Sequence, residues 1–155
     1  MIIRNNLNKM AGSLLINGPL TQNIISILLE TLGENTGTGG YSIFLGQVRA
    51  DMKEGKKVIE IEYSAYEAMV HKEADSIIQS ILSEFDEVKN IKILHSVGRI
   101  KAGEISLFVL VSANHRRHAI DACSKTVELI KSNFPVWKKE IFEDNTHEWQ
   151  ENTLA

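Results

Sequence analysis

The 155-residue sequence contains a single cysteine, Cys123, so no disulfide bond can form within one chain. It has no apolar run approaching the roughly 20 residues that a membrane-spanning helix needs. Its first residues, MIIRNNLNKMAGSLLING, lack the long apolar centre of a secretory signal. From these absences we expect a protein of the reducing cytoplasm, without a membrane partner.

Several motifs of well-known enzymes are also missing. The sequence has no Gly-rich phosphate loop of the P-loop type and no GxSxG turn. The HEW at 147–149 lacks the second histidine of a metalloprotease helix, and His115 and His118 lack an obvious third ligand. We therefore expect neither a bound metal nor a cofactor.

The composition is that of a globular protein, with 43% hydrophobic and 24% charged residues. The net charge of −3 argues against a general nucleic-acid or membrane binder. Its distribution is uneven: residues 115–139 hold six basic and two acidic residues, a net charge of +4, which leaves −7 for the rest. A concentrated positive charge on an acidic background suits a small anionic ligand better than a polyanion.

The hydrophobic patterning predicts a mixture of helices and strands without regular βαβ alternation. Helices are expected over 19–33, 67–85 and 117–134, and strands over 41–48, 58–66, 91–95, 105–113 and 138–142. Thr21 is expected to cap the first helix and Gly33 to end it. We also expect a flexible loop at about 49–57 and a polar tail at about 143–155. The fold class is therefore α+β, as one domain over residues 1–155.

The segment KSNFPVWKKE, residues 131–140, is the strongest candidate for chemistry. Pro135 interrupts the helix between Lys131 and Lys138, so the bend lets the two amines converge on one side. A lysine beside another cation and an apolar wall has a lowered pKa and can act as a nucleophile or an acid–base group. The alternative is structural: Trp137 and Phe134 close the core while the lysines reach into water.

Two further segments are weaker candidates. His115 and Arg116 follow an apolar strand and begin a helix, where backbone N–H groups and a guanidinium favour an anion. In GQVR (46–49), Arg49 follows a strand and would place a guanidinium at the sheet edge. For both, ordinary solvated surface residues are the alternative. Cys123 lies among apolar helix positions, which predicts a buried, inert thiol.

Four segments occur together in an order and spacing that resembles a known family. They are FLGQVR (44–49), GRIKAGE (98–104), the HR at 115–116 and IKSNFPVWKKE (130–140). Over about residues 15–150 the chain resembles the large, catalytic subunit of molybdopterin synthase, the MoaE family. The resemblance implies an α/β hammerhead-type fold with mixed and antiparallel strands and two long helices.

The resemblance also implies an activity and partners. The expected enzyme is a sulfurtransferase that converts cyclic pyranopterin monophosphate (precursor Z) to molybdopterin in molybdenum cofactor biosynthesis. The sulfur would come from the C-terminal Gly-Gly thiocarboxylate of a small, ubiquitin-like, MoaD-like carrier subunit. The family arrangement is a homodimer within a heterotetramer. Delivery of the sulfur by a partner would explain how a chain whose one cysteine is a core residue can act as a sulfurtransferase.

Carried over by motif, Lys131 and Lys138 correspond to the two catalytic lysines. The substrate-binding residues implied by the resemblance are Gln47, Val48, Arg49, His115, Arg116, Lys139 and Glu140. The family pocket lies near the dimer interface, so Arg49 is a candidate to serve the neighbouring subunit. One departure is His95-Ser96, where the family commonly has His-Arg, and it weakens any role for an arginine there.

Two interpretations compete with this enzyme. In one, the chain is a non-catalytic module that binds a nucleotide or phosphopeptide through a basic pocket formed by residues 115–139. In the other, the segment around Pro135 only buries Trp137, and both lysines are dispensable. Product formation with a thiocarboxylated carrier separates the first interpretation from the enzyme, and lysine variants separate the second.

Overall fold

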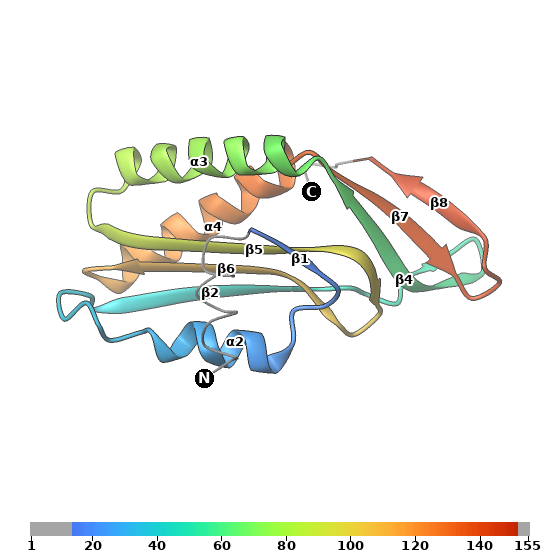
Figure 1. Cartoon of the computed structure of the whole chain (residues 1–155), viewed down its shortest axis with the longest axis horizontal. Coiled ribbons are helices and arrows are strands. Elements are labelled where there is room, and N and C mark those ends of the chain that lie inside the picture. The colour runs from blue at the N-terminus through green and yellow to red at the C-terminus, as the bar shows by residue number, and fades with distance from the viewer. Residues whose placement is uncertain (1–13, 152–155) are drawn as a thin grey trace.

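The structure is a computed structural model that describes residues 14–151. Residues 1–13 and 152–155 lie outside the described part. The two ends of the expected domain, most of the N-terminal stretch compared with a secretory signal, and the last residues of the expected polar tail therefore lie outside it as well. The helices are α2 (Gln22–Glu30), α3 (Glu67–Glu84) and α4 (Arg116–Asn133). The strands are β1 (Leu15–Asn17), β2 (Gly40–Gln47), β3 (Met52–Lys53), β4 (Lys56–Ala65), β5 (Val88–Lys101), β6 (Ile105–Ala113), β7 (Val136–Phe142) and β8 (His147–Gln150) (Figure 1).

The strands form one sheet in the order β2-β6-β5-β4-β7-β8, with antiparallel neighbours throughout this path. In addition, β1 pairs in parallel with β5, and β3 forms a hairpin with β4. The long strand β5 belongs to two regions: its first half pairs with β6 and its last residues pair with β4. We call β3, β4, β7 and β8 the arm, which extends sideways from the helix-covered body (Figure 1).

Helices cover the body of the sheet on both faces, with α3 and α4 on one side and α2 on the other (Figure 1). Strand β6 is buried along almost its whole length, as its apolar sequence predicts for a central strand. Val109 and Val111 belong to the cluster packed against α3 and α4, whereas Phe108 and Leu110 face the α2 side. This alternation follows from the period of two in a strand.

Most of the predicted elements are confirmed, including the α+β class, the mixed pairing and the two long helices. Thr21 caps α2 as expected, because its hydroxyl accepts a hydrogen bond from the Ile24 N–H at 3.3 Å. In the described residues no helix is both long and apolar enough to cross a bilayer.

The structure differs from the predictions mainly in the short strands. β1, β3 and β8 were not predicted, because two to four residues carry too little pattern. The expected loop at 49–57 contains the β3–β4 turn, formed by Glu54 (φ 49°) and Gly55 (φ 76°); its flexibility stays a prediction. The expected polar tail contains β8, which pairs with β7.

Candidate active site

A pocket of about 510 Å³ lies where the arm meets the end of α4. Six of the residues named from the sequence line it: Gln47, Val48, Arg49, Lys131, Lys138 and Glu140. They come from β2 and the segment after it, from the last turn of α4 and from β7. A single chain therefore brings the two lysines and the GQVR segment to one place.

The bend at Pro135 explains how the lysines converge. Helix α4 ends at Asn133, and the Phe134 N–H donates the last helical hydrogen bond to Ile130 O. Phe134 has extended backbone angles (φ −62°, ψ 128°), as expected for a residue before proline, and its side chain is buried. Because Phe134 anchors the corner, β7 begins at once, and Lys138 lies in the same pocket as Lys131.

The environment makes both lysines easier to deprotonate than ordinary ones. Burial lowers the pKa of Lys131 to about 8, with the Lys138 ammonium acting in the same direction and Glu128 opposing the shift. Burial also lowers the pKa of Lys138, with Glu140 acting in the opposite direction. Lys131 is nevertheless an exposed residue, so solvent screening makes the effect of burial on its pKa smaller than for an enclosed lysine. Both amines therefore lose a proton more readily than a lysine on an open surface.

A buried histidine, His95, lies close to the lysines and is only 5% exposed. Its Nδ1 is 2.7 Å from Ser96 O, and since a carbonyl only accepts, Nδ1 carries the hydrogen. Its ring meets the Tyr63 ring edge to face, with centroids 5.2 Å apart. Burial lowers the pKa of His95 to about 4, and the ammonium groups of Lys131 and Lys138 act in the same direction. The imidazole is therefore neutral and adds no positive charge to the pocket.

One wall of the pocket carries hydroxyl groups that the sequence did not single out. The Tyr63 hydroxyl donates to Ser106 Oγ at 3.2 Å, and Ser106 Oγ lies 3.5 Å from Gly46 O. Burial raises the pKa of Tyr63, so the phenol stays protonated. All three residues line the pocket and offer polar groups to a ligand. The strand pattern put Tyr63 on the same face as Ile61, but only the pairing of Tyr63 with Lys138 places it in the site.

A third pocket lysine, Lys53, was also not predicted. It comes from β3, and its Nζ lies 2.7 Å from Oε2 of Glu140. Glu140 is buried and shares a face of β7 with Lys138. The sequence missed Lys53 because its segment was expected to be a loop.

His115 and Arg116 are at the opposite end of α4. Arg116 precedes Lys131 by 15 residues, which is about 22 Å along a helix axis. His115 Nδ1 lies 2.8 Å from Glu87 Oε2, and His115 and Arg116 line a separate pocket of about 420 Å³. In a single chain, residues 115–139 do not form the one basic pocket that the sequence suggested, because the long helix between them holds its two ends apart.

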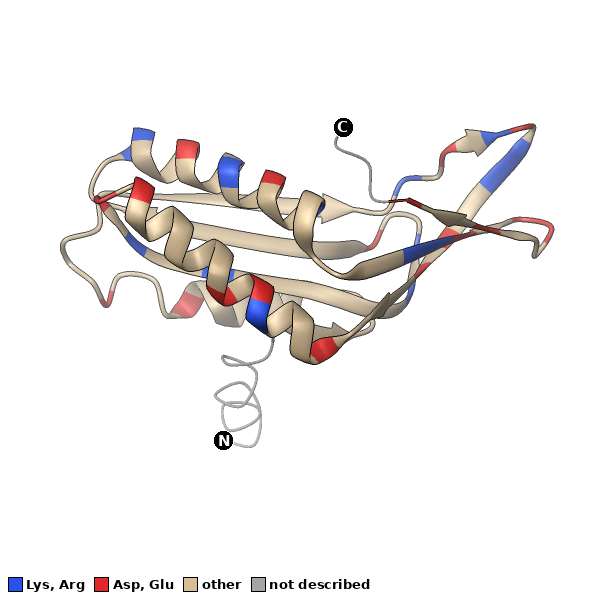
Figure 2. Cartoon of the chain, turned by 90° about the horizontal axis from the view of Figure 1, so that it is seen from above, with Lys and Arg blue, Asp and Glu red and all other residues tan. Residues whose placement is uncertain are grey.

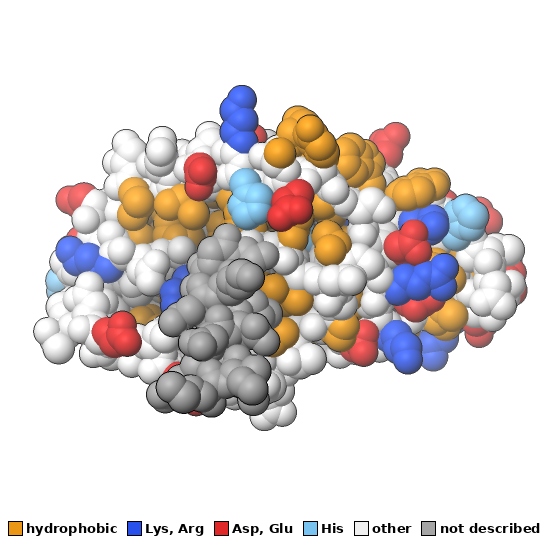
Figure 3. Space-filling view, viewed as in Figure 1, with side chains coloured by type: hydrophobic (Ala, Val, Ile, Leu, Met, Phe, Trp, Pro, Cys, Tyr) orange, Lys and Arg blue, Asp and Glu red, His pale blue; other side chains and the backbone are white. Residues whose placement is uncertain are grey.

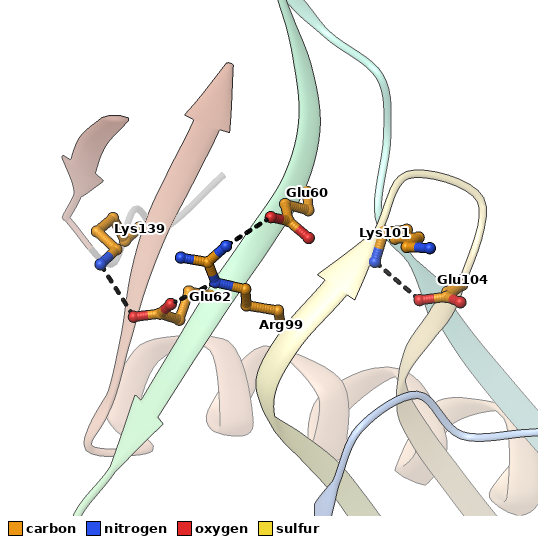
Figure 4. Close-up of polar contacts among 6 residues, drawn as sticks. All are labelled: Glu60, Glu62, Arg99, Lys101, Glu104 and Lys139. Carbon is orange, nitrogen blue, oxygen red and sulfur yellow. Dashed lines mark hydrogen bonds and ion pairs between the residues drawn. The ribbon is translucent and has the colours of Figure 1, made fainter. Parts of the chain in front are cut away.

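Lys139 lies on the other face of β7, away from the lysine pocket. Its Nζ is 2.9 Å from Glu62 Oε1, and 5.4 Å from the centre of the Trp149 ring. Glu62 also pairs with Arg99, which reaches Glu60 as well (Figure 4). Figure 2 shows basic and acidic residues along the arm, and Figure 3 shows them side by side on its surface. In this chain Lys139 is therefore engaged by Glu62 and Trp149 outside the lysine pocket, and its role in substrate binding stays a prediction.

Two other sequence expectations have clear outcomes. Trp137 is 51% exposed and lies on the Lys139 side of β7, so the interpretation in which the segment only buries Trp137 is wrong. Cys123 is buried as predicted, and burial raises the pKa of its thiol, which makes it a poor nucleophile. Within residues 14–151, no three or more His, Cys, Asp or Glu side chains gather to hold a metal ion.

Comparison with known proteins identifies similar chains. A family model described as MoaE protein matches residues 20–133. A molybdopterin synthase catalytic subunit from Dictyostelium discoideum is 35% identical over 136 residues, covering 86% of this chain and 85% of that protein. One from Drosophila willistoni is 40% identical over 139 residues, 89% of this chain but 36% of that protein. The chain spans about a third of the length of the Drosophila relatives that it matches.

Solved structures share the fold. A molybdopterin synthase from Staphylococcus aureus superposes with a TM-score of 0.78 at 30% identity, covering 90% of this chain and 97% of that one. A Helicobacter pylori protein, in a complex of subunits 1 and 2 of molybdopterin-converting factor, gives a TM-score of 0.74 at 20% identity, covering 91% of both chains. At that identity the second likeness concerns the fold alone.

Proposed function

The chain belongs to the MoaE protein family, and on that premise we propose that it is the catalytic subunit of a molybdopterin synthase. The reaction is sulfur transfer to cyclic pyranopterin monophosphate, which gives the dithiolene of molybdopterin. The observation that carries the proposal is the pocket shared by Lys131 and Lys138, whose amines have lowered pKa values. Lysines that lose a proton easily bring no advantage to a pocket that only binds a phosphate. They do bring an advantage to a reaction that includes proton transfer.

The sulfur donor in this proposal is a small, ubiquitin-like carrier subunit with a C-terminal Gly-Gly thiocarboxylate. Its tail enters the pocket, and its sulfur passes to the pterin precursor. Displacement at the precursor and later hydrolysis of the carrier's acyl group both develop negative charge on oxygen, which the ammonium groups of Lys131 and Lys138 stabilise. The neutral hydroxyls of Tyr63 and Ser106 offer hydrogen bonds to the substrate. We propose that the reaction uses no cofactor in addition to the pterin substrate and the carrier.

We further propose a homodimer within a heterotetramer, located in the cytoplasm. His115 and Arg116 lie too far from Lys131 in the same chain to share its pocket. In a homodimer, His115 and Arg116 can instead contribute to the pocket of the neighbouring copy. Arg49 differs, since it lines the lysine pocket of its own chain; its exposed guanidinium, 3.2 Å from Asp51, makes it a candidate to contact a neighbouring copy as well.

A single-turnover reaction tests the activity. The protein is mixed with cyclic pyranopterin monophosphate and thiocarboxylated carrier, and product is read as its fluorescent oxidation derivative. We expect Lys131→Ala and Lys138→Ala each to abolish most product while the fold survives. Lys125→Ala is the matched control, because Lys125 lies on the same helix but pairs with Glu84 outside the pocket.

Two results would count against the proposal. Near-normal product from either pocket variant would remove that lysine from the chemistry. Wild-type protein that binds the pterin phosphate but forms no product with a cognate carrier would favour a binding module.

A further inference from the structure

The β3–β4 hairpin carries two lysines that face each other across its strands. Lys53 pairs with Lys56 in the register, and the turn between them is Glu54-Gly55, both with positive φ. Two successive residues of positive φ give the tight turn that matches the twist of a hairpin. The hairpin therefore holds two chemically identical side chains at neighbouring positions.

The two lysines pair with different carboxylates. Lys53 Nζ lies 2.7 Å from Glu140 in the pocket, where the side chains are 35% and 11% exposed. Lys56 Nζ lies 2.8 Å from Asp144 in the β7–β8 connection, where they are 44% and 42% exposed. Water screens the second pair more strongly than the first. Breaking the Lys53 pair would leave a largely buried carboxylate without its cation, which is the more costly change.

Glu140 matters because it is two residues after Lys138 on the same face of β7. A carboxylate at this position stabilises the charged form of Lys138 and opposes the effect of burial on its pKa. Lys53 supplies a positive charge 2.7 Å from an oxygen of the same carboxylate. The carboxylate is thereby shared, and its influence on Lys138 is reduced.

The other charged groups around Lys138 do not take over the role of Lys53 beside Glu140. From the neighbouring elements they are Lys131 on α4, Arg49 and Asp51 after β2, Tyr63 on β4, His95 on β5 and Glu151 after β8. Arg49 and Asp51 pair with each other, and Tyr63 and His95 are uncharged at neutral pH. Glu151 is exposed, so its charge is screened by water. Lys131 is a cation beside Lys138, but a change at Lys53 leaves it in place. The charge that a change at Lys53 alters beside Lys138 is therefore that of the Lys53–Glu140 pair.

We propose that Lys53 is a positioning residue of the site, which fixes the Glu140 carboxylate and balances its charge so that Lys138 can exchange a proton with bound substrate. The catalytic part of this inference, proton exchange between Lys138 and the substrate, rests on the proposed function. The arrangement of Lys53, Glu140 and Lys138 can nevertheless be tested without any turnover.

The test is a comparison of Lys53→Met, Lys53→Arg and Lys56→Met with the wild type. Competitive acetylation of lysines over a range of pH, with fragment ions that separate Lys138 from Lys139, reports the ionisation of Lys138 in the folded protein. In Lys53→Met we expect the ionisation of Lys138 to move to higher pH, because Glu140 is left unbalanced. In Lys53→Arg we expect Lys138 to ionise at the same pH as in the wild type, because the positive charge is kept. In Lys56→Met we also expect the ionisation of Lys138 to be unchanged.

The pH profile of single-turnover product formation is the second readout. It is expected to move to higher pH in Lys53→Met only. At a fixed pH below the midpoint, the neutral amine falls about tenfold for every pH unit by which the midpoint rises. An unchanged Lys138 titration in Lys53→Met, or an equal change in Lys56→Met, would overturn the inference. If the wild type forms no product, the proposed function fails, while the titration still decides the role of Lys53.

Discussion

The buried imidazole of His95 makes the stability of the protein depend on pH to an extent that can be calculated. The pKa of His95 is lowered from 6.5 to about 4 in the folded chain, chiefly by burial. The unfolded chain then binds more protons than the folded one between these two values, so stability falls as the pH falls through that window. The full difference is about 3 kcal/mol, and about 2 kcal/mol of it is lost by about pH 5. Above about pH 6.5 the contribution of His95 to stability is fully present.

Urea unfolding at a series of pH values measures this dependence, with His95→Gln as the perturbation and His71→Gln as its control. His71 is a partly exposed histidine on α3 whose Nε2 lies 3.6 Å from Glu67. We expect His95→Gln to flatten the pH dependence between about pH 6.5 and about pH 4, whatever it does to stability at neutral pH. His71→Gln is expected to keep the slope. If His95→Gln and the wild type lose stability in parallel, His95 is not a buried neutral group and the description of the pocket is wrong.

The corner after α4 and the single cysteine give two further predictions. Phe134→Ala is expected to cost about 3–5 kcal/mol in urea unfolding because Phe134 is buried, whereas Trp137→Ala is expected to cost under about 1 kcal/mol because half of Trp137 is exposed. Equal losses would mean that Trp137 is part of the core after all. Cys123 is expected to react slowly with iodoacetamide in the folded protein and fully in urea, since its thiol is buried with a raised pKa. Rapid alkylation of the native protein would contradict this.

The sequence predicted those features that depend on long, regular patterns. Helices α3 and α4 and the buried strand β6 have enough residues for the period of 3.6 or the continuous apolar run to stand out. The convergence of Lys131 and Lys138 was also predictable, since Pro135 must end the helix and only a few residues separate the amines.

The remaining features depend on pairing between distant segments. Lys139 was placed in the site with Lys138 through the resemblance, but neighbours in a strand point to opposite faces. His115 was grouped with Lys131 by charge, although the helix between them separates the two residues. Lys53 enters the pocket only through a two-residue strand, which leaves almost no signal in the sequence.

The most direct test of the central claim follows the sulfur itself. In a single-turnover reaction with cyclic pyranopterin monophosphate, intact-mass analysis of the carrier distinguishes its thiocarboxylate from the carboxylate left after transfer. The account predicts that wild-type protein converts the carrier to the carboxylate as product forms, and that Lys131→Ala and Lys138→Ala leave the thiocarboxylate in place. Equal loss of carrier sulfur with wild type and both variants, or none with the wild type, would contradict the claim that these two lysines form a sulfur-transfer site.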